Sequence, residues 1–128
     1  MVFMLDTSVA IDLRDGAALV RDRMNDLSGT ICLSIIVRVE LEGGVFRDLP
    51  EPQLREARLR TMLANLPTVA FDDAAADVYR TIVAQQGYSR RKILDRMIAA
   101  QAIVEDATLI TLNGDDFREI QGLKLLEW

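Results

Sequence analysis

Histidine is absent from the 128-residue chain, and cysteine occurs only once. Without histidine there is no Ser-His-Asp or Cys-His catalytic arrangement and no histidine-based zinc site, and one cysteine cannot hold zinc or close an internal disulfide. The single thiol, Cys32, lies in an apolar run at residues 31–33 and is expected to be buried and structural, which fits a reducing compartment. Chemistry on this chain must therefore rely on carboxylates, hydroxyls, lysine and arginine.

Long hydrophobic segments are also missing. No apolar run approaches the roughly 20 residues that a membrane span requires, and no basic leader precedes the first apolar segment at residues 2–5. We therefore expect a cytoplasmic protein without a membrane segment. Half of the residues are hydrophobic, which is enough for a full core in a chain of ordinary domain length. With no linker, repeat or low-complexity tract, residues 1–128 are predicted to form a single domain.

Negative charge predominates, with a formal net charge of −5 at pH 7. Passive nucleic-acid-binding modules are usually basic, so this charge argues against one. It does not argue against an enzyme that meets phosphate groups through metal ions, because the metal supplies the positive charge.

Apolar runs bounded by turn residues alternate with helical patterns along the chain. Strands alternating with helices predict an α/β fold with a mainly parallel sheet of four to five strands and helices on both faces. The β-branched residues at 35–39 permit either a helical or an extended conformation. In the last helix, Asp95 lies on the apolar stripe, whereas Arg96, Gln101 and Glu105 are predicted on the outer face. The expected strands are 2–5, 30–33, 68–71, 108–112 and 123–126, and the expected helices are 9–14, 17–27, 35–42, 53–66, 73–86 and one from Ser89 or Lys92 to 105.

Carboxylates follow this pattern in an informative way. Asp6 comes directly after a buried strand, where an uncompensated charge is costly unless a cation or hydrogen-bond donors face it. A polar tip at residues 113–116 follows another strand, and the carboxyl ends of parallel strands share one edge, where such sheets bind ligands. Glu40 and Asp95 each lie on the inward face of a predicted helix. We therefore expect one pocket to collect these groups.

Each carboxylate also has a plainer structural explanation. Asp6 would cap the turn after its strand, and Glu40 would be a partly exposed helix residue. Asp95 would be a helix-start carboxylate favoured by the macrodipole, and Asp115 and Asp116 would cap the segment that follows them. Their joint placement at one predicted sheet edge favours a site.

A cluster of carboxylates without histidine predicts a particular chemistry. Clustered carboxylates repel one another unless they are protonated or bridged by cations. Ligation by oxygen alone suits Mg²⁺ or Mn²⁺, and such ions activate water and stabilise the leaving oxygen in phosphodiester hydrolysis. The sequence therefore predicts a route to nuclease chemistry.

Four motifs now resemble those of a known family. They are Met-Leu-Asp-Thr-Ser-Val at residues 4–9, Glu-Leu-Glu-Gly-Gly at 40–44, Asp-Arg-Met-Ile-Ala-Ala at 95–100 and Thr-Leu-Asn-Gly-Asp-Asp-Phe at 111–117. In their order, their spacing and the length of the chain, they resemble the PIN-domain ribonucleases, and specifically the VapC toxins of bacterial type II toxin–antitoxin pairs. Any one motif is weakly specific, whereas the four in order are specific.

The resemblance implies a three-layer α/β/α PIN fold and an Mg²⁺- or Mn²⁺-dependent endoribonuclease. By motif position, Asp6, Glu40 and Asp95 carry over as the acidic core of the catalytic metal site. The fourth position is open between two residues, because Asn113 stands where many PIN domains have aspartate and Asp116 is the nearest acid of the motif. We predict that Asp116 contributes through water and that Asn113 gives polar support.

The resemblance also implies supporting residues and partners. Thr7 and Ser8 are expected to hydrogen-bond the groups around the metal. The expected partners are an RNA substrate, a second copy of the chain, and a cognate antitoxin protein that blocks the site with a segment carrying an arginine. The basic run Arg90, Arg91 and Lys92 is predicted to meet RNA phosphate.

Some alternatives stay open. The basic residues Arg55, Arg58 and Arg60 either meet RNA or form a solvated face. A catalytically silent PIN-like interaction module is the non-enzyme alternative, against which an intact acidic set argues. A phosphoaspartate-type phosphatase requires a second aspartate where Ser8 stands, and a receiver domain requires an acidic pair before its first helix and a late lysine at a strand end, neither of which is evident.

Overall fold

A five-stranded parallel sheet forms the centre of the protein, for which the computed structural model describes residues 1–47 and 49–128. The strand order is β3-β2-β1-β4-β5, and every pairing is parallel. This confirms the predicted α/β architecture and the predicted number of strands. The strands are β1 (Val2–Leu5), β2 (Thr30–Ser34), β3 (Thr68–Val69), β4 (Thr108–Thr111) and β5 (Lys124–Glu127).

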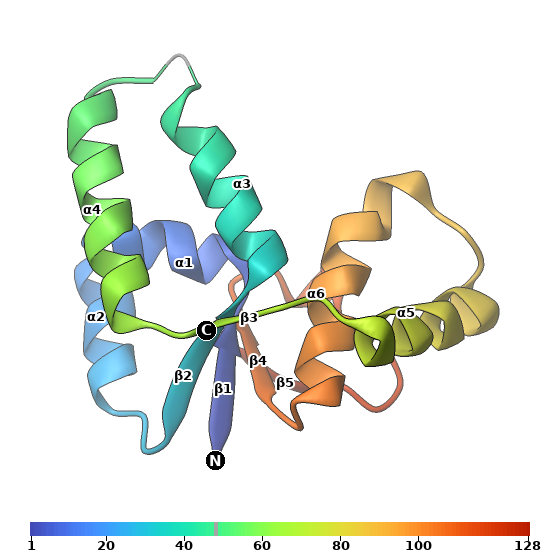
Figure 1. Cartoon of the computed structure of the whole chain (residues 1–128). Coiled ribbons are helices and arrows are strands. Elements are labelled where there is room, and N and C mark those ends of the chain that lie inside the picture. The colour runs from blue at the N-terminus through green and yellow to red at the C-terminus, as the bar shows by residue number, and fades with distance from the viewer. Residues whose placement is uncertain (48) are drawn as a thin grey trace.

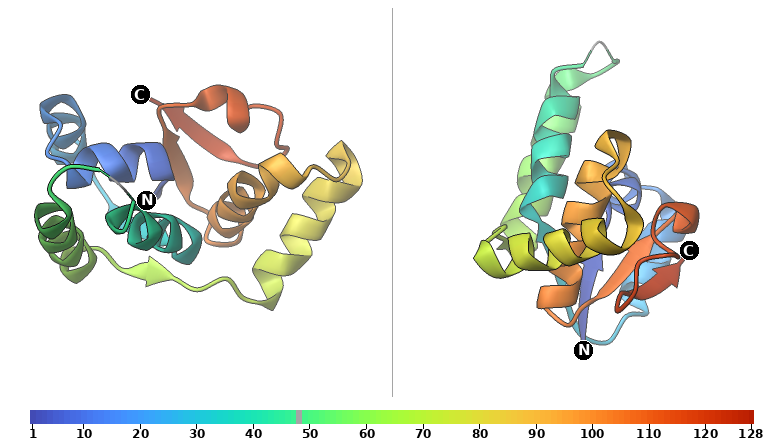
Figure 2. Two further views of the ribbon diagram at one scale, coloured as in Figure 1. Left: turned by 90° about the horizontal axis from the view of Figure 1, so that it is seen from above. Right: turned by 90° about the vertical axis from the view of Figure 1, so that its right-hand side faces the viewer.

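Helices cover both faces of this sheet. Seen from above, α1 and α2 lie on one side and α5 and α6 on the other, so the molecule has three layers (Figure 2). The helices are α1 (Thr7–Arg14), α2 (Ala18–Asn25), α3 (Ile35–Val45), α4 (Pro52–Asn65), α5 (Asp73–Gln86) and α6 (Ile93–Val104), with single 3₁₀ turns η1 (Arg90–Lys92) and η2 (Gly114–Asp116).

The carboxyl edge of the sheet lies between two tall elements. The hairpin of α3 and α4 rises beyond this edge, and α6 stands across from α3 over the end of β1 (Figure 1). β1 is the central strand, and the residue that follows it, Asp6, caps the start of α1 at this edge. This arrangement agrees with the expectation that ligands meet a parallel sheet at its carboxyl edge.

The core explains why the central strands read as continuous apolar runs. Met4 and Leu5 in β1 and Leu109 and Ile110 in β4 are completely buried, since helices cover both sides of these strands. The single thiol, Cys32, is also buried, as predicted. Within residues 1–47 and 49–128, no helix is both long enough and apolar enough to cross a membrane.

Local capping decides the two open helix boundaries. The hydroxyl of Ser34 accepts the backbone N–H groups of Ile36 and Val37 at 2.9 and 3.4 Å, so the β-branched segment after it is helical rather than extended. Further along, the 3₁₀ turn η1 follows Ser89 directly and α6 begins after Lys92, so each predicted start marks one of the two successive elements.

The prediction that Arg96 and Gln101 lie on the outer face of α6 is wrong. Arg96 is 4% exposed and donates to the carbonyl oxygen of Gly87 at 2.6 Å. Gln101 is 1% exposed, accepts a hydrogen bond from Ser34 Oγ at 2.6 Å and donates to the carbonyl oxygen of Val69 at 2.9 Å. The physical reason is that α6 lies between the sheet and α5, so even its polar positions are covered and must find partners inside the protein.

Candidate acidic site at the carboxyl edge of the sheet

Asp6 connects the central strand to the first helix. Its backbone N–H donates to the carbonyl oxygen of Ile110 at 3.0 Å, which continues the pairing of β1 with β4. Its side chain is 5% exposed, and Oδ1 caps α1 by accepting the N–H of Val9 at 3.1 Å. The capping explanation is therefore correct, although it accounts for only part of what surrounds this carboxylate.

Two hydroxyl groups also donate to Asp6. Ser8 Oγ donates to Oδ1, and Thr111 Oγ1 donates to Oδ2, each at 2.5 Å. These hydroxyls in turn accept the backbone N–H groups of Leu112 and Asn113 at 3.1 and 2.9 Å. Because each hydroxyl oxygen already accepts a hydrogen bond from a backbone N–H, its own O–H is directed at Asp6. The carboxylate is thus held in one orientation as an acceptor.

Thr111 is the residue that the sequence reasoning missed. It is completely buried at the end of β4, and it opens the fourth motif without having been assigned a role. A partial signal was available, since the carboxyl ends of parallel strands share one sheet edge and Thr111 lies at the end of a predicted strand. Choosing it required knowledge that β4 is the neighbour of β1.

Glu40 is brought to the same edge by α3. Thr7 Oγ1, in the first turn of α1, donates to Glu40 Oε1 at 2.9 Å. Burial raises the pKa of Glu40 above its usual range, the hydrogen bond from Thr7 works in the opposite direction, and the negative charge of Asp6 adds to the rise. Glu40 therefore lies within electrostatic reach of the strand-end carboxylate.

Asp95 lies in the first turn of α6, where the charges of the other three candidate carboxylates affect its pKa. Burial raises the pKa of Asp95 to about 6, and the charges of Asp116, Glu40 and Asp6 contribute in that order, while Lys92 acts in the opposite direction. Asp95 therefore lies within electrostatic reach of the other three carboxylates that the sequence selected.

The two candidates for the fourth position differ in environment. Asp116, in η2, exerts the strongest charge effect on Asp95. Asn113 is exposed, and its described role is to donate its backbone N–H to Thr111. Asp115 is exposed and forms an ion pair with Arg118. Of the acids in this motif, Asp116 is thus the one whose charge affects Asp95 in the acidic site.

The donor set can be tested for its fit to a metal ion. Every candidate ligand is an oxygen, which suits a hard divalent cation. In the described part of the chain, no three acidic side chains lie close enough to hold an ion by themselves. Mg²⁺ is usually bound by only one or two carboxylates and keeps several waters. The residues fit an ion that some of them contact directly and others contact through water. The pKa of Asp95 is raised first by burial and then by neighbouring negative charge, and a cation would relieve the charge repulsion.

The two basic runs differ in the structure. Arg90 and Arg91 are exposed in η1, next to Lys92, whose charge reaches Asp95. The run at residues 55–60 does not form one surface. Arg55 is 8% exposed and donates to the carbonyl oxygens of residues 45, 47 and 49. It therefore neither contacts RNA nor lies on a solvated face, because its guanidinium group binds the backbone between α3 and α4. Arg60 forms ion pairs with neighbouring glutamates at positions 42 and 56.

Several known proteins are similar to this chain over most of its length. The family model described as PIN domain matches residues 3–123. The tRNA(fMet)-specific endonuclease VapC of Shigella flexneri is 30% identical over 98% of this chain and 97% of its own length. Ribonuclease VapC2 of Rickettsia felis is 31% identical over 100% of this chain and 98% of its own length.

Solved structures show the same similarity. The structure of VapBC2 from Rickettsia felis bound to a promoter DNA fragment contains a chain with a TM-score of 0.86 and 29% identity, covering 100% of this chain and 99% of that chain. The DNA-bound VapBC of Salmonella typhimurium contains one with a TM-score of 0.85 and 27% identity, covering 100% and 98%.

Proposed function

Because this chain belongs to the PIN domain family, we propose that it is a metal-dependent endoribonuclease and the toxin of a toxin–antitoxin pair. The observation that carries the proposal is the acidic site, in which burial, followed by the charges of Asp116, Glu40 and Asp6, raises the pKa of Asp95. Relatives that match over nearly their full length are named as an endonuclease and a ribonuclease, which supports the reaction class. We further propose that residues 1–128 form one domain.

The acidic residues would hold Mg²⁺ or Mn²⁺. When bound, such an ion lowers the pKa of water and neutralises charge on the phosphate during phosphodiester hydrolysis. Asp6 supplies an oriented carboxylate, because the hydroxyls of Ser8 and Thr111 and the N–H of Val9 hold it in place. Preorganised ligands of this kind need no rearrangement when substrate arrives.

The remaining carboxylates complete the proposed site. Thr7 orients Glu40 by a hydrogen bond, and Asp95 and Asp116 approach from α6 and η2 on the other side. Lys92 lies within electrostatic reach of Asp95 and, with the exposed Arg90 and Arg91, offers cations to the phosphates of RNA.

The proposed partners are based on the similar solved structures. The similar structures include VapBC complexes and a toxin–antitoxin complex from Klebsiella pneumoniae. We therefore propose that this chain forms homodimers and binds a cognate antitoxin in a hetero-oligomer. The net charge of −5 and the acidic site are complementary in charge to an antitoxin segment that carries an arginine.

Metal-dependent cleavage of RNA tests the reaction. The purified chain is incubated with total RNA in Mg²⁺, in Mn²⁺ and in excess chelator, and products are resolved by size. We expect cleavage with either metal, none in chelator, and recovery when metal is returned. Asp6→Asn is expected to abolish cleavage with the fold retained, whereas Asp115→Asn, which changes an exposed carboxylate beside the site, retains it. Equal cleavage in excess chelator would refute metal dependence.

Growth experiments test the toxin assignment. Expression of the chain is expected to arrest bacterial growth, and co-expression of the neighbouring open reading frame should relieve the arrest through a stable complex. Asp95→Asn should remove the toxicity. Normal growth together with no stable partner would favour the silent interaction module instead.

A further inference from the structure

A pocket opens beside the acidic site, between α1, α3 and α4. It has a volume of about 460 Å³, and its lining begins at Thr7 and Glu40 and extends to the start of α4. Four of its lining residues are arginines, namely Arg14, Arg47, Arg55 and Arg58. We refer to this cavity as the arginine pocket. It is therefore continuous with the carboxylates and opposite in charge along much of its length.

Two of these arginines are fixed in the wall. Arg14 is 9% exposed, and its Nε donates to Asp15 Oδ1 at 3.0 Å. Arg55 is 8% exposed, and its Nη2 donates only to backbone carbonyl oxygens. Its Nε is buried and has no hydrogen-bond partner among the described residues. Arg55 therefore adds positive charge to the wall of the pocket without being free to contact a ligand itself.

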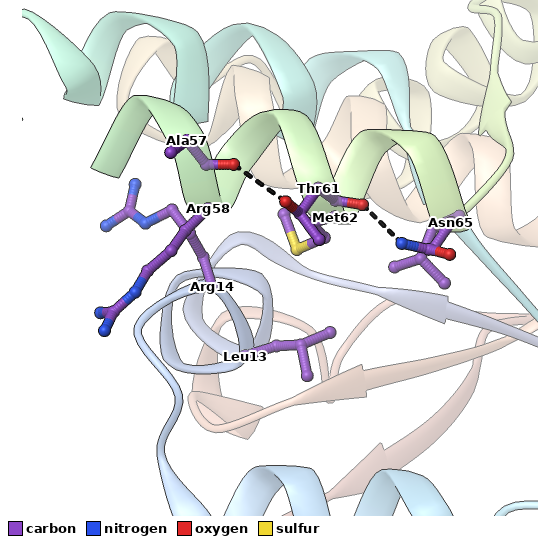
Figure 3. A pocket seen from close by; sticks show the side chains of 8 residues that line it. Leu13, Arg14, Ala57, Arg58, Thr61, Met62 and Asn65 are labelled. Carbon is purple, nitrogen blue, oxygen red and sulfur yellow. Dashed lines mark hydrogen bonds between the residues drawn. The ribbon is translucent and has the colours of Figure 1, made fainter. Parts of the chain in front are cut away.

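The other two arginines lie at the rim. Arg47 and Arg58 are exposed, and Arg58 Nη1 donates to the carbonyl oxygen of Asp15 at a long 3.4 Å. Figure 3 shows the adjoining pocket between α1 and α4, where the guanidinium groups of Arg14 and Arg58 lie at the same end, away from Thr61 and Asn65. Cations from two helices thus gather at one place.

The carboxylates of the lining do not cancel this charge. The arginine pocket also contains Asp15, Glu40 and Glu51. Asp15 is already paired with Arg14, and Glu40 belongs to the acidic site. Outside the acidic site, the lining therefore carries four arginines and two carboxylates. A mobile anion entering from solvent would meet a net positive surface.

We propose that the arginine pocket binds a phosphate of the substrate RNA that neighbours the cleaved linkage, with Arg47 and Arg58 as direct contacts. The identity of the anion rests on the proposed function. Without a bound metal ion, an acidic site repels the phosphate backbone, so binding affinity must then come from cations beside it. The arginine pocket adjoins Glu40 directly, whereas Arg90 and Arg91 lie in η1, before α6. Continuity with the acidic site favours RNA over an acidic peptide. When one phosphate of a polynucleotide lies at the carboxylates, the next phosphate of the strand lies against an adjoining surface.

The inference is tested by RNA binding at several salt concentrations. A labelled short oligouridylate is titrated with the protein in chelator, which prevents metal-dependent cleavage, and anisotropy is measured. Arg47→Ala and Arg58→Ala are each expected to weaken binding about 3- to 10-fold and to reduce the slope of log Kd against log salt by about 0.7, the value for one phosphate contact on a single strand. With Mg²⁺, the same variants should raise KM more than they lower kcat.

Arg60→Ala is the matched control. Arg60 is an exposed arginine on the same helix as Arg58, pairs with glutamates and does not line the pocket. The Arg60→Ala variant should bind RNA with a Kd within about twofold of that of the unchanged protein. The reason is that salt screens the effect of a surface charge that lies far from a phosphate. An equal loss in Arg60→Ala would reveal a general charge effect and overturn the inference.

Other outcomes separate this inference from the proposed function. If the double variant Arg47→Ala/Arg58→Ala binds the oligouridylate with unchanged affinity and slope while the unchanged protein cleaves RNA, the pocket assignment alone is wrong. If the variants lose RNA binding although the unchanged protein cleaves no RNA, the pocket stands and the nuclease proposal fails. If the variants keep RNA binding but lose the antitoxin complex, the pocket is a protein-binding site and the RNA assignment is overturned.

Discussion

Replacement of Asp95 by asparagine is expected to stabilise the metal-free protein near neutral pH, although it removes a group from the proposed metal site. Burial and the charges of Asp116, Glu40 and Asp6 raise the pKa of Asp95 from 3.8 to about 6. The folded protein therefore holds this proton more tightly than the unfolded chain does. The contribution of Asp95 to the free energy of unfolding is fully present below about pH 4 and is lost as the pH rises through about 6.

The magnitude follows from the size of this shift. A rise of about two pKa units corresponds to about 3 kcal/mol. Asp95 is only partly buried, and solvent screening reduces this value to about 1–2 kcal/mol. For a chain of this length, that free energy raises the melting temperature by roughly 3–6 °C. Below about pH 4 the protonated aspartate and the asparagine are both neutral, so the two proteins should unfold alike.

Urea unfolding in chelator, at about pH 4 and about pH 7.5, measures the effect. Asp77→Asn on the exposed side of α5 serves as the control for a change in net charge. Added Mg²⁺ should stabilise the unchanged protein more than Asp95→Asn, because a ligand stabilises the folded state that binds it. Equal stability of Asp95→Asn and the unchanged protein at pH 7.5, or the same difference at both pH values, would refute the crowding of carboxylates.

Three further substitutions test the supports of the site. Thr111→Val should lower the free energy of unfolding by about 2–3 kcal/mol in urea titrations, because the buried Asp6 Oδ2 loses its donor and the N–H of Asn113 loses its acceptor. It should also slow RNA cleavage at least tenfold, whereas Thr111→Ser restores both. Asp116→Asn should lower the pKa of Asp95, measured by carboxyl NMR titration, and reduce cleavage, whereas Asn113→Ala leaves that pKa unchanged. Gln101→Leu should cost about 2 kcal/mol in urea titrations by leaving the carbonyl oxygen of Val69 unpaired, without changing the metal requirement of cleavage.

Much of the fold is readable from local patterns. The mainly apolar runs at 2–5 and 108–112 become the central strands, and every position after the first in β1 and β4 is buried because helices cover both faces. Helix ends follow capping chemistry, since Asp72 accepts the N–H of Ala75 at 2.9 Å and Gly87, with φ of 82°, ends α5. Such signals act within a few residues, so the sequence carries them without reference to the rest of the chain.

Predictions failed where burial depended on a second layer. Arg96 and Gln101 have the spacing of outward-facing residues, yet Arg96 is buried against the end of α5 and Gln101 against β2 and β3. Arg55 reads as part of a basic stripe, yet it is buried against the connection between α3 and α4. Long polar side chains give no local indication of whether another element will pack over them, because their hydrogen-bond partners come from other segments.

The acidic site divides in the same way. The sequence by itself determined which carboxylates end a strand or face inward from a helix, because strand and helix periodicity are local properties, and Asp6, Glu40, Asp95 and Asp116 were selected on that basis. Only the tertiary structure decided that Thr111, 105 residues from Asp6 in the chain, donates to it, and that Arg55 lies in the wall of a pocket beside Glu40. Hydrogen bonds and charge interactions depend on distances between atoms, and those distances are set when β4 pairs with β1 and when α4 packs beside α3.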